Sequence, residues 1–364
     1  MNKEAIKIIT LSKYSYQGAS SRYRFYNYQE CFKKENINMS IKPLFGKRYL
    51  RTHNKTIKTL IVLFAYLNRL LFLLHILIFK NRYRLIIIEY ELFPYLPPSF
   101  EYLLDKRGIK YIVDYDDAIF HKYDSNPLLK NKIAKVIEYA SCTIVCNEYL
   151  KEYASRYTDN IIQFPTVVIL DRYKKKRYNQ KPKEKDKFII GWIGSKSTSR
   201  YILDILPAMK RFVETYSDVY FNFVGFDEKL LSHIEQKEHH IHIKKWSEES
   251  EIDDILEFDI GIMPLDNTPW SKGKCGFKLI QYMSSFKPII ASPVGINRDL
   301  IDNKVNGFLA SSRDEWFDSF EKLYFNRDLA QKMATKNLDK INIEYNHKTI
   351  CKRYIKLIRT TIKG

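Results

Sequence analysis

Residues 274–295 (KCGFKLIQYMSSFKPIIASPVG) carry the side chains that a phosphate-binding site needs. A helix here would place Lys274, Lys278 and Gln281 on nearby faces, because they are spaced i, i+4 and i+7. Lysine can neutralise a leaving diphosphate, and the amide of Gln281 can hydrogen-bond a ribose hydroxyl. The turn SPVG then follows a strand, and ligands bind at that end of an open parallel sheet. The alternative is a pair of solvated lysines on a surface helix.

A second candidate lies in residues 191–200 (GWIGSKSTSR), where a strand meets a helix. Gly194 permits a tight turn and a close approach of the backbone, and Ser195 can cap the helix. The exposed N–H groups of such a helix bind anions, and Arg200 adds positive charge. The pattern is neither GxGxxG nor a Walker motif, so a plain capped turn is the alternative.

Carboxylates gather in residues 115–120 (YDDAIF), directly after the strand-like run YIVD. Asp116 and Asp117 are typical of acid/base catalysis, metal binding or contact with an acceptor hydroxyl. Helix N-caps also favour aspartate, which is the structural alternative. Gly18, in the loop YQGASSRYR after the first strand, permits a backbone close to a ligand, although a plain polar loop also fits.

The elements that must position these residues alternate along the chain. Short apolar runs rich in Ile and Val are typical of strands buried on both faces by helices, and their alternation with helices predicts parallel, doubly wound α/β sheets. The predicted strands are 6–11, 36–44, 85–92, 111–117, 142–147, 188–195, 219–225, 241–246, 258–265, 288–295 and 307–310; helices are expected from residue 99, near 126–140, from 199, and over 277–285 and 349–362.

The best domain boundary is the run 174–187 (KKKRYNQKPKEKDK), which has eight basic residues, two acidic residues and no apolar periodicity. A solvated linker is the simplest reading, and a contact with phosphate or lipid is the alternative. The alternation restarts after it. We therefore expect an N-terminal domain over 1–178 and a C-terminal domain over 179–346, a division that suits 364 residues.

The composition limits the classes of molecule that the protein is expected to bind. The 45% hydrophobic and 15% aromatic content supports two cores, and the net charge of +19 favours polyanions such as nucleic acid, anionic lipid or phosphorylated substrates. The basic residues cluster at the linker and around an apolar segment instead of forming an aromatic-interleaved platform, which argues against nucleic acid. Five cysteines without a CxxC motif favour reduced, mostly buried thiols and disfavour zinc.

The apolar segment 56–80 is long enough to suggest a membrane span, but Asn68, Arg69 and His75 interrupt it. An arginine near the centre of a membrane span raises the free energy of inserting that span into the bilayer. Basic residues flank both ends, so a helix lying in the plane of an anionic membrane fits best, with a buried helix and a true span as alternatives. The N-terminus leads straight into a strand without a signal peptide, which predicts a cytoplasmic protein, peripheral on the inner face of the plasma membrane.

Taken in order, these segments resemble the GT-B-fold glycosyltransferases of family four, the retaining "glycosyl transferases group 1". The matching segments cover nearly the whole chain, and the block over 259–297 is the most specific. It looks like bacterial members that build O-antigens, capsules and other surface polysaccharides. The segments are GASSRYRFYNY, VDYDDAIF, CTIVCNEYLKEYA, FPTVVILDRY, GWIGSKSTSRYIL, FVGFD, DIGIMPLDNTPWSKGKCGFKLIQYMSSFKPIIASPVGIN and NGFLA.

The resemblance implies two Rossmann-like domains facing across a cleft, with helix 347–364 completing the N-terminal one. It implies a nucleotide-diphosphate sugar as donor, no cofactor and no essential metal. The oligomeric state is left open. The implied donor contacts are Ser195 and Arg200 at the diphosphate or sugar, Lys278 at the phosphates, Gln281 at the ribose, and Gly18, Gly194, Gly225 and Lys274 around them.

The sequence departs from the family at two places. The usual pair of glutamates, eight apart, falls on Gly273 and Gln281, neither of which is acidic. The usual histidine of the N-terminal domain is replaced by the aspartates of YDDAIF. Asp117 is therefore the first candidate for the acceptor-side catalytic contact and Asp116 the second, with His121 as a weaker alternative.

The expected reaction is transfer of a sugar, with retention, to a lipid-linked or saccharide acceptor of a bacterial surface polysaccharide. A catalytically silent nucleotide-sugar-binding homologue is the first rival, because both glutamates are missing. An NAD(P)-dependent oxidoreductase is a second rival, but GWIGS lacks the spacing of the dinucleotide fingerprint. A nucleic-acid-binding protein is the third.

Overall fold

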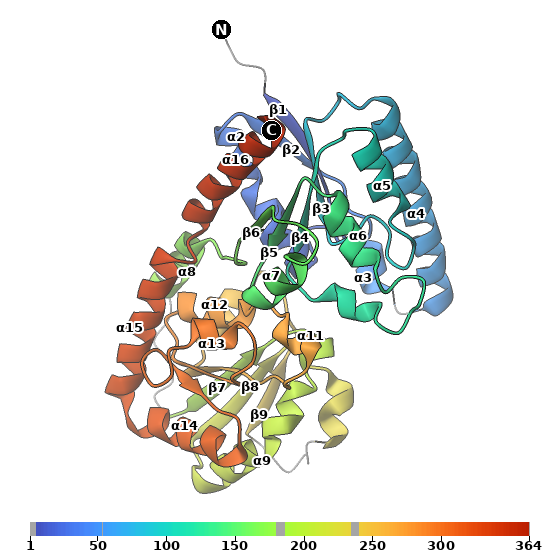
Figure 1. Ribbon diagram of the computed structural model, residues 1–364. Helices are drawn as coiled ribbons and strands as arrows, with labels where there is room; N and C mark the ends of the chain where they lie inside the picture. The colour runs from blue at the N-terminus through green and yellow to red at the C-terminus, as the bar shows by residue number, and fades with distance from the viewer. Residues whose placement is uncertain (1–4, 53, 180–185, 234–239, 364) are drawn as a thin grey trace. The chain divides into compact units, whose positions relative to one another are not determined.

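The computed structural model describes residues 5–52, 54–179, 186–233 and 240–363 (Figure 1). The described chain divides into two compact units. The first unit comprises residues 1–167, 273–275 and 347–364, and the second comprises 168–272 and 276–346. The sequence placed the boundary after residue 178, whereas the units divide after Val167. Residues 174–178 of the expected linker are helical, and 180–185 lie outside the described residues.

The first unit is built on a six-stranded sheet in the order β2-β1-β3-β4-β5-β6, and each neighbouring pair is parallel. Its strands are β1 (Ile6–Leu11), β2 (Ile37–Ile41), β3 (Leu85–Glu89), β4 (Tyr111–Tyr115), β5 (Cys142–Val145) and β6 (Ile161–Gln163). Its α-helices are α1 (Ala19–Arg24), α2 (Gln29–Lys34), α3 (Lys47–Arg51), α4 (Lys55–Ile78), α5 (Ser99–Lys106), α6 (Lys132–Tyr139), α7 (Glu148–Ala154) and α16 (His347–Lys363).

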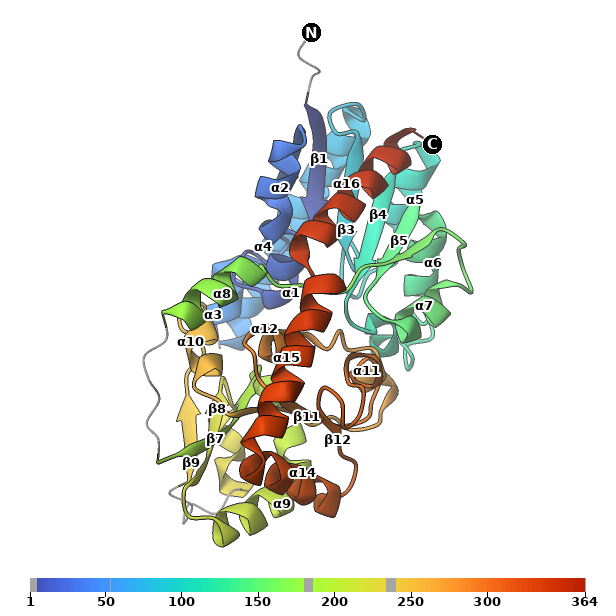
Figure 2. The same cartoon turned by 90° about the vertical axis from the view of Figure 1, so that its left-hand side faces the viewer.

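Helices cover both faces of this sheet. In Figure 1, α2 and α16 lie on one side of it and α4, α5 and α6 on the other. Every residue of β3 and β4 is buried, which is the outcome expected for apolar strands at the centre of a doubly wound sheet. Figure 2 shows α16, the last helix of the chain, running along the first unit beside strands from the N-terminal half.

The second unit repeats the plan with the order β12-β11-β10-β7-β8-β9, again parallel throughout. Its strands are β7 (Phe188–Ile193), β8 (Val219–Val224), β9 (Ile241–Lys244), β10 (Ile260–Met263), β11 (Ile289–Ala291) and β12 (Phe308–Leu309). Its α-helices are α8 (Leu170–Tyr178), α9 (Tyr201–Thr215), α10 (Glu251–Leu256), α11 (Pro269–Lys272), α12 (Phe277–Ser284), α13 (Asn297–Leu300), α14 (Arg313–Phe325) and α15 (Arg327–Ile343).

The core of the second unit forms where α9 and α14 pack on the sheet. Phe212 of α9 and Phe320 of α14 are fully buried against strands β7, β8 and β10. On the other side α12 packs on β10, where Gly261 makes room for the ring of Tyr282. Two parallel doubly wound sheets confirm the predicted α/β fold class.

The cysteines differ from the expectation at one pair. Cys142 and Cys146 are free and buried, and Cys275 is free and half-buried. The structure joins Cys31 of α2 to Cys351 of α16 in a disulfide, so the expectation of reduced thiols is wrong for these two. The pairing arises because α2 and α16 pack face to face, with the ring of Phe32 edge-on to the ring of Tyr354.

Candidate functional site

In the second unit, the turn after β7 and the start of α12 lie side by side. A Cβ atom added to Gly194 would come within 2.9 Å of Cε of Lys278, and it would also collide with the ring of Trp192. Lys278 is half-buried in the first turn of α12, and its Nζ lies 5.6 Å from the centre of the Trp192 ring. Two of the predicted donor residues, Gly194 and Lys278, therefore form one site at the carboxyl end of β7.

Gly225 closes the same site from the neighbouring strand. It follows β8 with a φ of 78°, a conformation that favours glycine, and a Cβ atom there would collide with the carbonyl oxygen of Gly194. The Gly194 amide in turn donates to the Val224 carbonyl at 2.9 Å. The third predicted glycine thus holds the turn in place by letting two backbones approach closely.

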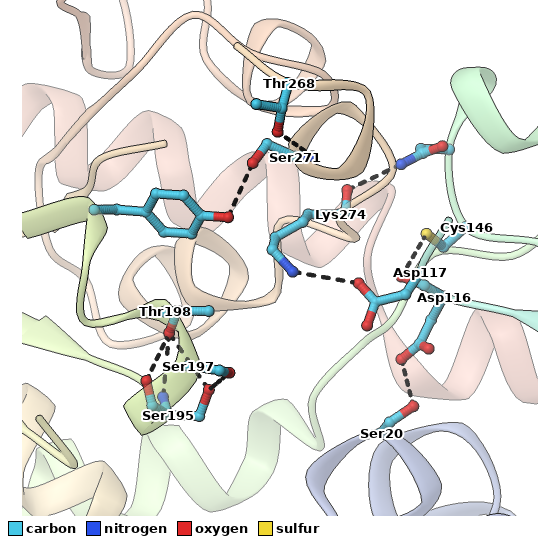
Figure 3. A network of polar contacts seen from close by, with 12 residues as sticks. Ser20, Asp116, Asp117, Cys146, Ser195, Ser197, Thr198, Thr268, Ser271 and Lys274 are labelled. Carbon is cyan, nitrogen blue, oxygen red and sulfur yellow. Dashed lines mark hydrogen bonds and ion pairs between the residues drawn. The ribbon is translucent and has the colours of Figure 1, made fainter. Parts of the chain in front are cut away.

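The serine and threonine side chains of the turn form hydrogen bonds within the turn, as Figure 3 shows. The Ser195 amide donates to Oγ1 of Thr198 at 3.3 Å, and that hydroxyl donates to the Ser195 carbonyl at 2.9 Å. The hydroxyls of Ser195 and Ser197 are 3.0 Å apart. Ser195 is exposed, so its side chain can meet a ligand as well as complete the turn.

Arg200 lies beside a carboxylate that the sequence did not single out. Its Nη2 atom is 3.8 Å from Oδ2 of Asp266, which follows β10. Asp266 is fixed because it accepts hydrogen bonds from Ser271 and from Oγ1 of Thr268, the latter at 2.8 Å. The hydroxyl groups of Ser271 and Tyr201 are 3.1 Å apart and extend the network (Figure 3). Arg200 is exposed and keeps its charge at the surface.

Two other predicted donor residues are placed differently. Lys274 is not on a helix with Lys278, because Gly276 adopts a φ of 66° and α12 begins only at Phe277. The segment 273–275 belongs instead to the first unit. Gln281 is buried, and its Nε2 atom is 3.5 Å from the hydroxyl of Tyr173 in α8, so its amide packs within the unit.

In the first unit, Lys274 lies at the carboxyl end of β4. Its Nζ is 3.5 Å from Oδ1 of Asp117, and its carbonyl accepts a hydrogen bond from Nδ2 of Asn147 at 2.9 Å (Figure 3). Gly273 allows this approach, since a Cβ atom there would collide with Ala118. Burial raises the pKa of Asp117, and the positive charge of Lys274 opposes that rise.

Asp116 is buried, and both of its carboxylate oxygens accept hydrogen bonds. It accepts a hydrogen bond from Oγ of Ser20 at 2.6 Å and another from the hydroxyl of Tyr90. Tyr90 follows β3 with a φ of 65°, an uncommon conformation for a bulky residue that often marks a functional site. The structure thus gives the two predicted catalytic aspartates different environments: Asp117 is more accessible, and Asp116 is held by hydroxyl groups.

The remaining sequence candidates of the first unit have structural partners. Gly18 is the N-cap of α1, where a Cβ atom would collide with the side chain of Tyr14. Arg24, which ends α1, is buried and pairs with Asp114 at 2.7 Å. His121 hydrogen-bonds the carboxylate of Asp124 and the hydroxyl of Tyr149, at 2.7 and 2.8 Å.

Comparison with known proteins places the second unit in a family. Residues 174–339 match the family described as "Glycosyl transferases group 1". This segment contains Gly194, Arg200, Gly225 and Lys278. The protein is a glycosyltransferase. A search of curated proteins found no match to the sequence.

Solved structures show that the glycosyltransferase has the GT-B fold. It is similar to sucrose-phosphate synthase from Thermosynechococcus elongatus, with a TM-score of 0.72, 13% identity and coverage of 98% of this chain and 99% of that one. It is similar to a glycosyltransferase from Rickettsia africae, with a TM-score of 0.71, 15% identity and full coverage of both chains. HepE from Anabaena, solved with UDP-glucose, gives a TM-score of 0.68, 12% identity and coverage of 98% and 100%.

Sequence reasoning missed one buried carboxylate of the glycosyltransferase. Glu89 ends β3 and accepts hydrogen bonds from the Lys13 amide at 2.7 Å and from Oγ of Ser21 at 2.6 Å. Its other oxygen, Oε1, is buried and has no hydrogen-bond partner among the described residues. Burial raises the pKa of Glu89 to about 7. The available signal was its position, because a glutamate that ends an all-apolar strand reaches the carboxyl edge of the sheet.

Proposed function

We propose that this glycosyltransferase moves a sugar from a nucleoside-diphosphate donor to a saccharide or lipid-linked acceptor of a bacterial surface polysaccharide, with retention at the anomeric carbon. The observation that carries the donor assignment is the contact between the Gly194 turn and Lys278, in a domain of the glycosyltransferase family. HepE, which shares the fold, was solved with UDP and with UDP-glucose.

Within this proposal the donor diphosphate lies between the turn and α12. The Gly194 turn brings backbone close to a phosphate, while Lys278 and the exposed Arg200 supply positive charge. Charge-assisted hydrogen bonds to phosphate are the strongest available to such a site, and they strengthen as negative charge grows on the leaving group. We assign no ribose contact to Gln281, because its amide faces Tyr173.

On the acceptor side we propose Asp117 as the catalytic residue and Asp116 as its support. The bond from the anomeric carbon to the diphosphate oxygen breaks, the acceptor oxygen forms the new bond on the same face, and Asp117 receives the hydroxyl proton. Burial raises the pKa of Asp117, which increases its affinity for that proton. The proposed reaction forms no covalent bond between the sugar and the enzyme.

We propose further that the reaction needs no metal, because Lys278 and Arg200 supply the neutralising charge. Transfer measured after treatment with EDTA should equal transfer in the presence of Mg²⁺. A loss of more than tenfold with EDTA, restored by Mg²⁺ or Mn²⁺, would overturn this part of the proposal. We place the protein in the cytoplasm, on the inner face of the plasma membrane.

The test of the whole proposal is a transfer assay with a panel of nucleoside-diphosphate sugars and lipid-linked or oligosaccharide acceptors. One donor should yield a nucleoside diphosphate and a glycosylated acceptor with the wild type, and Lys278→Ala should abolish both. A protein that binds a nucleotide sugar without turnover in any combination would be the catalytically silent homologue.

A further inference from the structure

Helix α4 exposes most of its apolar surface. Only 17% of its most apolar stretch is buried, although its composition is that of a core helix or a membrane span. A helix that is apolar on all sides is normally enclosed by protein or lipid. One side of α4 therefore has an apolar surface that the described chain does not cover.

The protein-facing side is fixed by specific contacts. Arg69 is buried and donates from Nη2 to the carbonyl oxygens of Ser12 and Lys42, each at 3.0 Å. Tyr66 donates to the Pro94 carbonyl at 2.7 Å. The charge that interrupts the apolar segment thus points into the first unit, and it does not lie on the exposed side. This anchoring also argues against a true span, because it ties the middle of α4 to the ends of strands.

The other side carries a continuous row that we call the α4 stripe. Its residues follow one another at spacings of three and four, so they line one face of the helix. Their exposed fractions run from 42% to 72%, and Leu63 beside them is 61% exposed. A contiguous row of this kind marks an interaction surface, in contrast to scattered apolar residues. The α4 stripe consists of Ile57, Leu60, Phe64, Leu67, Leu71, Leu74 and Ile78.

The charge around the stripe has one sign. Residues 36–88 contain no aspartate or glutamate, although the whole chain has 42. The same stretch holds ten basic residues, and apart from the buried Arg69 they precede the stripe, lie at its first turn or follow its end. They are Lys42, Lys47, Arg48, Arg51, Lys55, Lys58, Arg69, Lys80, Arg82 and Arg84.

This distribution of charge distinguishes between two possible partners of the α4 stripe, a second copy of the chain and a lipid surface. The spacing of the stripe resembles a coiled-coil seam, which would pair α4 with a second copy. The flanking positions of such a seam are usually charged, but here they include Ile61, Leu70 and Leu77. Both ends of α4 are cationic, so parallel and antiparallel pairs would each bring like charges together. An anionic lipid surface satisfies the apolar stripe and the cationic ends at the same time.

We propose that the α4 stripe docks in the plane of an anionic bilayer, with its apolar side chains at the acyl boundary and its basic ends among the headgroups. The helix is about 36 Å long at 1.5 Å per residue, so it provides an elongated contact. The proposal rests on the proposed function only for what the docking achieves, namely bringing the active site to a membrane-borne acceptor. Docking itself is measured without donor or acceptor, so the two can fail separately.

The apolar part is tested by sedimentation with vesicles of phosphatidylcholine alone and of phosphatidylcholine with phosphatidylglycerol. The wild type should bind only the anionic vesicles and should dissociate in 0.5 M NaCl, a concentration that screens charges. The triple variant Leu60→Ser/Leu67→Ser/Leu71→Ser should bind at least tenfold more weakly. The matched control, Leu128→Ser/Phe325→Ser/Ile343→Ser, changes apolar residues elsewhere that are even more exposed, and it should bind like the wild type.

A second pair of variants tests the contribution of the basic residues at the ends of α4 to vesicle binding. Lys55→Gln/Lys58→Gln/Lys80→Gln should weaken binding at least tenfold, whereas Lys332→Gln/Lys336→Gln/Lys352→Gln removes the same net charge elsewhere and should leave most binding intact. Each variant is folded if its thermal unfolding midpoint lies within about 2–3 °C of that of the wild type, a shift that corresponds to a small change in the free energy of unfolding.

Two results would overturn the proposal. One is a folded wild type that binds neither kind of vesicle. The other is a wild-type dimer in sedimentation velocity that the triple serine variant converts to a monomer, without vesicle binding by either; this would assign the α4 stripe to a second copy of the chain.

Discussion

The Nζ atom of Lys274 lies 3.5 Å from Oδ1 of Asp117, and the segment that carries this lysine packs with the first unit although its flanks belong to the second. The lysine opposes the effect of burial on the aspartate. We therefore propose that Lys274 acts through Asp117 as a positioning residue, whereas the sequence suggested that it binds the donor directly.

Removing this charge should change the pH dependence of transfer. Because the positive charge of Lys274 lowers the pKa of Asp117, Lys274→Met should raise that pKa. Because the ionised aspartate is the form that receives the acceptor proton, the acidic limb of the kcat/KM profile should move to higher pH. Lys274→Arg keeps the charge and should restore the position of the limb. An unchanged limb in Lys274→Met would show that the pair does not tune Asp117.

Lys278 should dominate donor binding. Lys278→Ala removes the cation beside the Gly194 turn and should lower kcat/KM about 100-fold or more, a loss typical of one electrostatic contact to a developing charge. Lys278→Arg should recover part of it. Lys332→Ala, an exposed lysine of α15, serves as the control and should be neutral. Equal activity of Lys278→Ala and wild type would contradict the donor site.

Glu89 should make the protein less stable as pH rises. Its pKa is about 7 in the folded state, above its usual value near 4.5, so between these values the folded state holds a proton that the unfolded state has released. The free energy of unfolding then falls between pH 5 and pH 8, by at most about 3 kcal/mol from this group. Glu89→Gln should reduce this fall in urea unfolding measured at the two pH values. A variant with the same fall as wild type would show that the folded-state pKa of Glu89 is not raised.

Gly225 should resist substitution. Gly225→Ala adds a Cβ at a φ of 78° that collides with the carbonyl of Gly194, and we expect destabilisation of about 1–3 kcal/mol together with weaker donor binding. Gly46→Ala is the matched control, since no atom lies within 4 Å of its added Cβ, and it should be neutral. Chemical denaturation gives both values, and equal stability of the two variants would contradict the geometry.

The sequence predicted the alternating strands and the fold class well because buried parallel strands have a clear apolar signature. It missed β6, which has three residues and only partial burial. It also read the start of the basic run as linker, although α8 continues to Tyr178 and buries only Leu170 and Tyr173. A helix with so few buried positions has no apolar period to detect.

Site residues were predictable where backbone constraints dominate and less so where tertiary partners decide. Gly194 and Lys278, both of which the family resemblance assigned to the donor, lie in contact. Lys274 does not share a helix with Lys278 as predicted, because Gly276, in a left-handed conformation, separates it from α12. The partners of Gln281 and Glu89 come from helix packing and from neighbouring strands, which no local pattern encodes.

The most direct test of the central claim is thermal unfolding of the wild type and of Lys278→Ala with each common nucleoside diphosphate and its sugars. A specific donor nucleotide at 100 times its dissociation constant should stabilise the wild type by about 2.7 kcal/mol. The account predicts that one nucleoside diphosphate raises the midpoint of the wild type and leaves that of Lys278→Ala unchanged. No shift with any nucleotide or nucleotide sugar, or an equal shift in both proteins, would contradict it.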